Sequence, residues 1–187
     1  MAKIGLKNFK YSKYDEETGK LTTATSLGKA VSCKVSIDKN EAELYADDGL
    51  AESDYTFKKG TITLEVDEDA DIVFADLLGH TISAESENAG EVVRNSNDVA
   101  PFVAVGRILT KIVNGARKYK VEFLSKVKFK EPDADETTKG ESVEFKTSSI
   151  EGTIMQLESG EWSKAKTFDT YTEAETYLNG LLTPASE

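Results

Sequence analysis

The residues best suited to catalysis or metal binding are scarce in this sequence, which contains one histidine, His80, and one cysteine, Cys33. Zinc sites draw on several cysteine and histidine ligands, and serine or cysteine nucleophiles need a histidine placed beside them. No Gly-x-Ser-x-Gly motif is present to hold a serine nucleophile on a sharp turn. His80 follows Gly79 at the predicted end of a helix, where a histidine usually caps a carbonyl or lies half exposed. These residues favour neither zinc binding nor nucleophilic catalysis.

Carboxylates are abundant, and one cluster has the spacing of a calcium loop. Asp67, Asp69 and Asp71 occupy the first, third and fifth positions of such a loop. Its sixth position is Ile72 instead of glycine, and its twelfth is Leu78 instead of glutamate. The start of a helix explains these aspartates better, because negative charge is favourable at a helix N-terminus.

A second cluster, Tyr45-Ala46-Asp47-Asp48, resembles the metal-binding hairpin of some polymerases. A chain of 187 residues is too small to contain a polymerase palm, and its net acidic charge also argues against one. We therefore predict no enzyme, no cofactor and no metal site. An enzyme would have to use His80, or the paired carboxylates of Asp47 and Asp48, in a deep pocket.

The charge balance narrows the class of partner. The chain has 23 Lys and Arg against 34 Asp and Glu, a net charge of −11, which argues against binding nucleic acid or an anionic membrane. A single cysteine permits no internal disulfide. Lysines interrupt the apolar residues of 1–7, so we expect neither a signal peptide nor a membrane span, and we expect a cytoplasmic protein.

Alternating apolar residues predict that strands dominate the fold. The clearest alternation covers 119–129, and the Ile- and Val-rich segment before it ends at Asn114-Gly115, a dipeptide typical of type I′ turns. We therefore predict a long hairpin over 102–129, with Tyr119, Val121, Phe123, Val127 and Phe129 on one buried face and lysines on a face in water. Further strands are predicted at 4–11, 31–37, 62–66, 143–147 and 150–157.

Two short helices complete the expected fold. One covers 70–78, with Asp69 as N-cap and Gly79 after its end, and the other begins at Thr170, with Glu173 completing a capping box. The fold class is mainly β with two short helices, an α+β arrangement built on a β-sandwich or barrel. We expect a single domain over 1–182 and a tail over 183–187, with loops at 14–26, 44–57, 83–89 and 131–139.

Charge is distributed in blocks along the chain. The segment 41–91 has 15 acidic and 2 basic residues, whereas 107–130 has 8 basic and 1 acidic. Complementary surfaces of this kind can dock copies head to tail into rings or open stacks. The alternative, which the charge pattern alone favours, is that the lysines solvate the outer face of the strand and protect it from edge pairing.

Five stretches resemble the major tail protein of long flexible-tailed bacteriophages. They are 43–54, 90–95 together with 98–102, 118–132, 139–145 and 162–170, and the resemblance runs in order from about Lys3 to about Leu182. It implies a β-sandwich or barrel flanked by a helix, six copies to a ring, and rings stacked into a hollow tail tube.

The resemblance also implies partners and a location. A tail tube protein assembles with copies of itself and with the tape measure, tail terminator and tail tip proteins. Double-stranded DNA passes through the lumen without specific binding, and a net negative lumen would let it slide. Such a protein is made in the cytoplasm of the host and ends in the virion. The alternatives are a terminator or baseplate ring protein of related fold, and a soluble β-sandwich binding module.

Two sets of residues are expected to carry assembly. Tail tubes use a long loop between early strands to reach the next ring, which we expect over 44–57, with Leu44, Tyr45, Asp47, Asp48, Leu50, Asp54, Tyr55 and Phe57 as its contact residues. The hairpin over 102–129 is expected to pair with neighbouring subunits, using Phe102, Val103, Val105, Tyr119, Val121 and Phe123.

Overall fold

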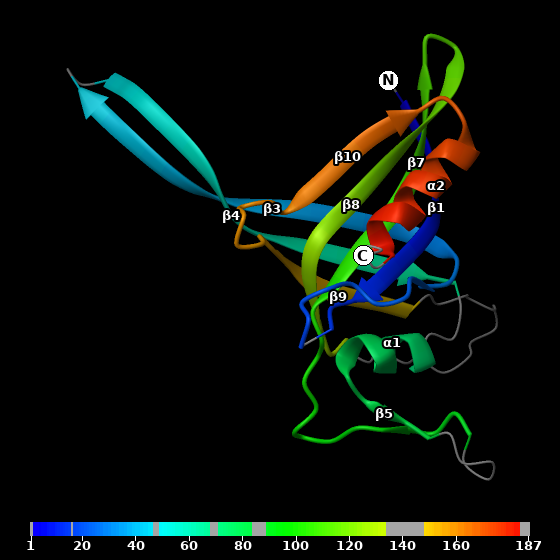
Figure 1. Cartoon of the computed structure of the whole chain (residues 1–187). Helices are drawn as coiled ribbons and strands as arrows, with labels where there is room; N and C mark the ends of the chain where they lie inside the picture. Colours follow the sequence, from blue (N-terminus) through cyan, green and yellow to red (C-terminus); the bar gives the residue numbers. More distant parts are fainter. Residues whose placement is uncertain are drawn as a thin grey trace, which may run out of the picture.

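The computed structural model describes residues 2–15, 17–46, 49–67, 71–83, 89–133 and 148–183. These residues are mostly in antiparallel strands, with two short helices, so the expected mainly-β class is confirmed (Figure 1). Within them, neither helix has the length and apolarity to cross a membrane.

Eight strands of the described residues form one antiparallel sheet. Their order is β2-β1-β7-β8-β9-β4-β3, and β10 pairs with β8 beside this path. The bounds are β1 (Ala2–Lys13), β2 (Thr25–Ser26), β3 (Ala30–Ala46), β4 (Gly49–Val66), β7 (Val103–Val113), β8 (Ala116–Lys130), β9 (Ser148–Met155) and β10 (Ser163–Phe168). Two short strands, β5 (Thr81–Ile82) and β6 (Val92–Val93), pair separately.

The sheet folds over so that its two halves face each other. Figure 1 shows β3, β4 and β9 crossing behind β1, β7 and β8. The main core fills the space between them, with side chains from both halves of the sheet. Its buried members include Phe9, Tyr11, Ile62, Leu64, Val66, Val103, Val105, Val127, Phe129, Ile150 and Ile154.

Helix α1 (Asp71–Leu78) closes one end of this core. Phe74, Leu77 and Leu78 are buried in the core. Asp76 accepts a hydrogen bond of 2.6 Å from the Tyr11 hydroxyl, which ties the helix to β1. The helix ends at Gly79, whose positive φ of 78° suits glycine and where an added Cβ would collide with the Val99 carbonyl oxygen.

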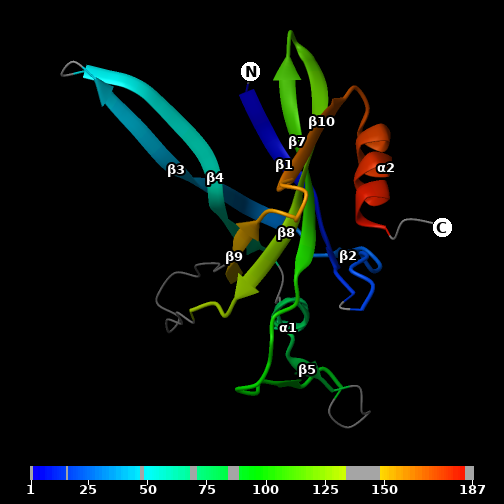
Figure 2. The same ribbon diagram turned by 60° about the vertical axis from the view of Figure 1, so that its left-hand side comes forward.

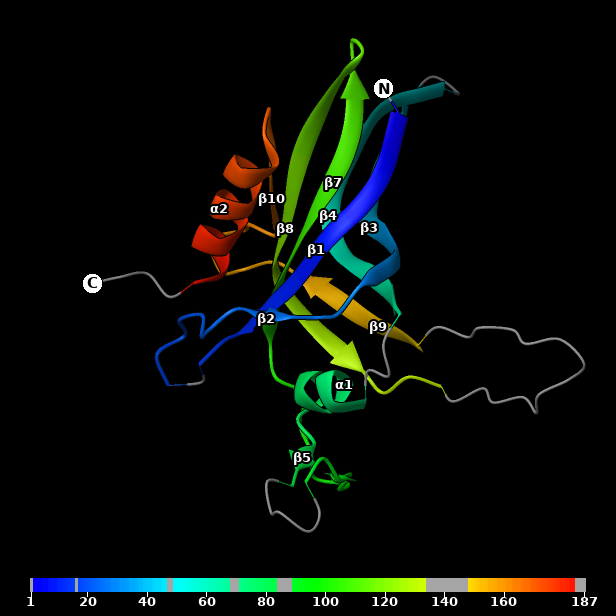
Figure 3. The same cartoon turned by 90° about the vertical axis from the view of Figure 1, so that its right-hand side faces the viewer.

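Helix α2 (Tyr171–Leu182) covers the outer face of β7 and β8, on the side away from β3, β4 and β9 (Figure 3). The predicted N-cap is confirmed, because the Thr170 side chain accepts from the Glu173 amide. The Glu173 carboxylate accepts over 2.8 Å from the Thr170 hydroxyl, whereas a complete capping box would use the Thr170 amide. Leu178 packs so closely on Gly106 that a Cβ there would collide with it. A second core therefore forms, made of Ala104, Ile108, Val121, Phe123, Ala174, Leu178 and Leu182.

The hairpin predicted over 102–129 is confirmed, but its single apolar face is wrong. Asn114 and Gly115 both have positive φ, 51° and 79°, as a type I′ turn requires. Val103 pairs with Val127 while Val105 pairs with Leu124, so β8 carries one extra residue between these pairs. This bulge reverses the faces of the strand, because side chains alternate with a period of two.

The two ends of β8 therefore bury their apolar residues on opposite sides of the sheet. Val121 and Phe123 face α2, whereas Val127 and Phe129 face the main core. Lys120 and Glu122 point into the molecule beside Arg107 and are only partly exposed, so the expected continuous face in water is also wrong.

Other predicted segments differ in their boundaries. The strands at 4–11 and 150–157 are confirmed as β1 and β9, and the helix at 70–78 as α1. The expected loop 14–26 contains β2 and a bridge between Tyr14 and Leu21. The strand expected at 143–147, the Asp69 cap, and most of the loops at 83–89 and 131–139 lie outside the described residues.

Candidate functional site

The hairpin of β3 and β4 extends beyond the sheet that it starts in. The two strands pair along their whole length, from Ala30 with Val66 to Ala46 with Gly49. β4 pairs with β9 only over 60–66. From Lys39 and Phe57 onward, each of these two strands pairs with the other and with no further strand of the described residues. We call residues 39–46 and 49–57 the arm, and Figures 1 and 2 show it reaching away from the rest of the molecule.

The segment 44–57, predicted as a loop, is therefore corrected to paired strands. Leu44 pairs with Glu52, and Tyr45 pairs with Leu50, while Asp47 and Asp48 lie outside the described residues. Within this segment residues 53–56 are all exposed, so burial imposes no alternation on them.

Phe57 marks the base of the arm. Its ring stacks on Trp162, with ring centroids 4.9 Å apart and planes 9° apart, and both side chains pack against the main core. On the core side of Phe57, Gly60 lies so close to Ile37 and Ile154 that an added Cβ would be 2.8 Å and 3.0 Å from their Cδ1 atoms. The hairpin is thus held firmly up to Phe57.

Beyond its base, the arm presents charged and aromatic groups to solvent. Tyr55 is 51% exposed, and the Lys39 ammonium lies 5.7 Å from its ring. Glu41 and Asp54 are exposed and have no ion pair with the described residues. No strand in the described part of the chain pairs with the main-chain groups on the two outer edges of the arm. Such edges are templates for pairing with another chain.

The residues expected to pair subunits through β7 and β8 lie elsewhere than predicted. Val103, Val105, Val121 and Phe123 are buried inside the single chain, at no more than 4% exposure. β7 lies between β1 and β8, and β10 and β9 occupy the other edge of β8 in succession. These strands have no free edge over most of their length, so this part of the prediction is corrected.

The remaining two residues of that set reach the surface. Tyr119 is partly buried and meets Tyr171 edge-on, with centroids 5.7 Å apart. Phe102 is 37% exposed, and the ammonium groups of Lys126 and Lys128 lie 4.2 Å and 5.2 Å from its ring centroid. Phe102 was thus predicted as a contact residue, but its lysine neighbours were missed. They lie at or beyond the bulge in β8, which sequence alone does not reveal.

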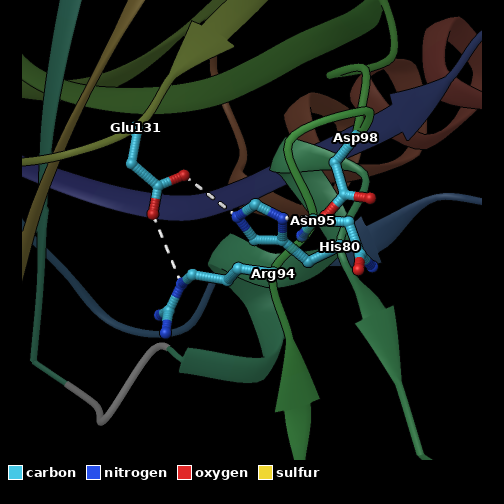
Figure 4. A network of polar contacts seen from close by, with 5 residues as sticks. All are labelled: His80, Arg94, Asn95, Asp98 and Glu131. Carbon is cyan, nitrogen blue, oxygen red and sulfur yellow. Dashed lines mark hydrogen bonds and ion pairs between the residues drawn. The ribbon is translucent and has the colours of Figure 1, made fainter.

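His80 forms the centre of a separate polar network (Figure 4). Its Nδ1 lies 2.7 Å from Asp98 Oδ2, and its Nε2 lies 2.9 Å from Glu131 Oε2. Arg94 Nε lies 3.4 Å from the same carboxylate of Glu131, and the Asn95 amide donates to Asp98 over 2.8 Å. The side chain of His80 is 8% exposed, so the expected half-exposed cap is corrected to an enclosed side chain between two carboxylates.

This network connects three segments distant in sequence. Hydrogen bonding to Asp98 is the main cause that raises the pKa of His80 above its ordinary value of 6.5, and Glu131 acts in the same direction. Both ring nitrogens are engaged by carboxylates, which leaves neither to serve as a base for a nucleophile. The geometry is that of a clamp holding the exit of α1 and the segment before β7 to the end of β8.

A second ionic group lies inside the folded sheet. Glu122 accepts hydrogen bonds from Arg107 over 2.6 Å and from Lys120 over 2.5 Å, and Arg107 also contacts the sulfur of Cys33. Burial raises the pKa of the Cys33 thiol despite this guanidinium. Cys33 therefore stays a thiol at neutral pH and lies against the main core, where the sequence placed it.

No set of three metal-ligating side chains is gathered in the part of the chain that the structure describes. No protein-family model matches this chain, and no curated protein matches its sequence. Within the described residues, the surfaces that carry features of an interface are the arm, with its unpaired edges and exposed carboxylates, and the exposed ring of Phe102.

Proposed function

We propose that this chain is a structural subunit that assembles with copies of itself into stacked, hexameric rings of a bacteriophage tail tube. The observation that carries the proposal is the arm, a paired hairpin that leaves its own domain with both edges open and with exposed carboxylates. A monomer gains little from such a projection, whereas an assembly can use it to join one ring to the next.

Two further observations support this role. The resemblance of 43–54, 90–95 together with 98–102, 118–132, 139–145 and 162–170 to major tail proteins includes most of the arm. The net charge of −11 suits a channel through which DNA passes without being held, because wall lysines would bind its phosphates. In this proposal the protein is not catalytic and binds no cofactor. Its place is the virion, after assembly in the host cytoplasm with tape measure, terminator and tail tip proteins.

Electron microscopy of the purified protein at high concentration, with light scattering on the same sample, tests the proposal. Hollow tubes of stacked rings are the expected result. Single rings that never stack would favour a terminator or baseplate protein instead. A monomer that stays monomeric even with tail tip proteins would contradict the proposal and favour a binding module.

A further inference from the structure

A groove of about 550 Å³ opens on the surface near the base of the arm. It is formed by the segment leading into β7, the bulged part of β8, the connection from β9 to β10, and the turn after β1. Its apolar lining includes Val99, Phe102 and Leu157, of which Val99 is 69% exposed. Exposed apolar surface bordered by charge is typical of a contact for another protein.

The groove also carries cationic groups that the rest of the described chain does not neutralise. Lys126 and Lys128 line it, and both ammonium groups lie over the Phe102 ring without an ion pair to any described residue. Asp15 lies at the rim, but its carboxylate already accepts from the amides of Glu17 and Thr18 and from the Thr18 hydroxyl. Glu158 also lines the groove, so the site is not uniformly basic.

The outer part of the arm has the complementary chemistry. The segment 41–55 contains six carboxylates and no basic residue, and it includes Leu44, Tyr45, Leu50 and Tyr55. Two of its exposed carboxylates, Glu41 and Asp54, have no ion pair with the described residues. A segment of this composition fits a groove of apolar groups with two free ammonium groups.

The outer arm runs away from the body of its own chain, so it does not fill the groove of that chain. The connection from β9 to β10 takes part in both surfaces, since its Trp162 stacks on Phe57 at the base of the arm and its Leu157 and Glu158 line the groove. Figures 1 and 2 show the arm leaving this point and running outward. From Phe57 to Gly49 the paired strands extend about 25 Å, at about 3.3 Å per residue.

We propose that the outer arm of one copy docks in the Phe102 groove of the next copy, with its carboxylates against Lys126 and Lys128. This inference rests on the proposed function and names the receiving surface for the contact between rings. The two surfaces differ, so the contact is heterologous, and repeated contacts of this kind build an open stack.

Charge reversal on each side tests the contact. Lys126→Glu with Lys128→Glu should leave a folded monomer but raise the concentration needed for assembly about tenfold or more, because like charges then face each other. Glu41→Lys with Asp54→Lys should have the same effect. All four substitutions together should restore assembly toward that of the wild type. The matched control is Lys7→Glu with Lys34→Glu, two exposed lysines away from the groove, which should assemble normally.

Oxidation of a variant carrying Asp54→Cys and Lys128→Cys gives a readout that does not need tubes. Disulfide-linked ladders in the double variant, absent from either single variant, are the expected result. If the wild type forms tubes and the variant with Lys126→Glu and Lys128→Glu forms them equally well, the inference is overturned and the proposed function stands. A wild type that never assembles would contradict the proposed function, and the docking contact would then be upheld or overturned by the presence or absence of the cross-link.

Discussion

The inner and outer parts of the β3–β4 hairpin have the same pairing but opposite surroundings. The inner part pairs with β9 as well, and Ile62, Leu64 and Val66 on it are buried in the main core. The outer part, the arm, pairs only with itself and exposes Tyr55. An isolated two-stranded hairpin is only marginally stable in water, so burial makes the inner part the one that stabilises the monomer.

The largest loss of unfolding free energy is expected from a substitution in the inner part of the hairpin. Leu64→Ala removes a side chain that is 1% exposed and leaves a cavity between the two halves of the sheet. We expect the free energy of unfolding to fall by about 2–5 kcal/mol, measured by urea denaturation. A loss below about 1 kcal/mol would show that the inner part is not the stabilising half.

An intermediate effect is expected at the boundary. Phe57→Ala removes the ring stacked on Trp162 but only part of a buried surface, so we expect a loss of about 1–2 kcal/mol. Trp162 is the one tryptophan of the chain, and its fluorescence should shift to longer wavelength as water reaches it. An unchanged emission spectrum would mean that the stack does not hold the base of the arm in solution.

The network around His80 lies outside the hairpin and makes the free energy of unfolding depend on pH, so it provides a comparison that does not involve the arm. The raised pKa of His80 means that the folded state holds the imidazole proton more tightly than the unfolded state does. The stability that this proton adds is therefore fully present below about pH 6.5 and is lost as pH rises through the folded-state pKa. Asp98, whose pKa is lowered chiefly by the Asn95 amide, adds the opposite loss at acid pH.

His80→Gln should therefore destabilise the protein more at about pH 5.5 than at about pH 8.5, as measured by urea denaturation at each pH. Arg94 on the shared Glu131 carboxylate remains in both proteins and so does not enter the difference. An equal loss at both pH values would argue that the imidazole is held uncharged.

The smallest effect is expected on the arm. Tyr55→Ala removes an exposed ring and its contact with Lys39, so the free energy of unfolding should change by no more than about 0.5 kcal/mol. This variant is the counterpart of Leu64→Ala in the same urea series. A loss comparable with that of Leu64→Ala would remove the distinction between the two parts of the hairpin.

Local signals in the sequence predicted the elements that depend on neighbouring residues. The Asn114-Gly115 turn, the capping of α2 by Thr170 and Glu173, and the end of α1 at Gly79 all follow from short-range geometry. The bulge in β8 was missed because one extra residue leaves no mark on composition, although it changes which face each side chain occupies.

Features that depend on distant residues were harder to predict. His80 meets Asp98 and Glu131, 18 and 51 positions away, and no local pattern indicates either partner. The segment 44–57 was predicted as a loop because sequence patterns detect strands through a buried face, and residues 53–56 are all exposed. The acidic composition of 44–57, together with the family resemblance, nonetheless predicted this segment as a contact with other copies.

Deletion of residues 47–54 tests most directly the claim that the arm serves other copies instead of its own fold. We expect a variant whose thermal unfolding midpoint stays within a few degrees of the wild type, because no core residue is lost, and which forms no tubes in electron microscopy under conditions where the wild type does. Tubes that still form, or a variant that fails to fold, would contradict the account.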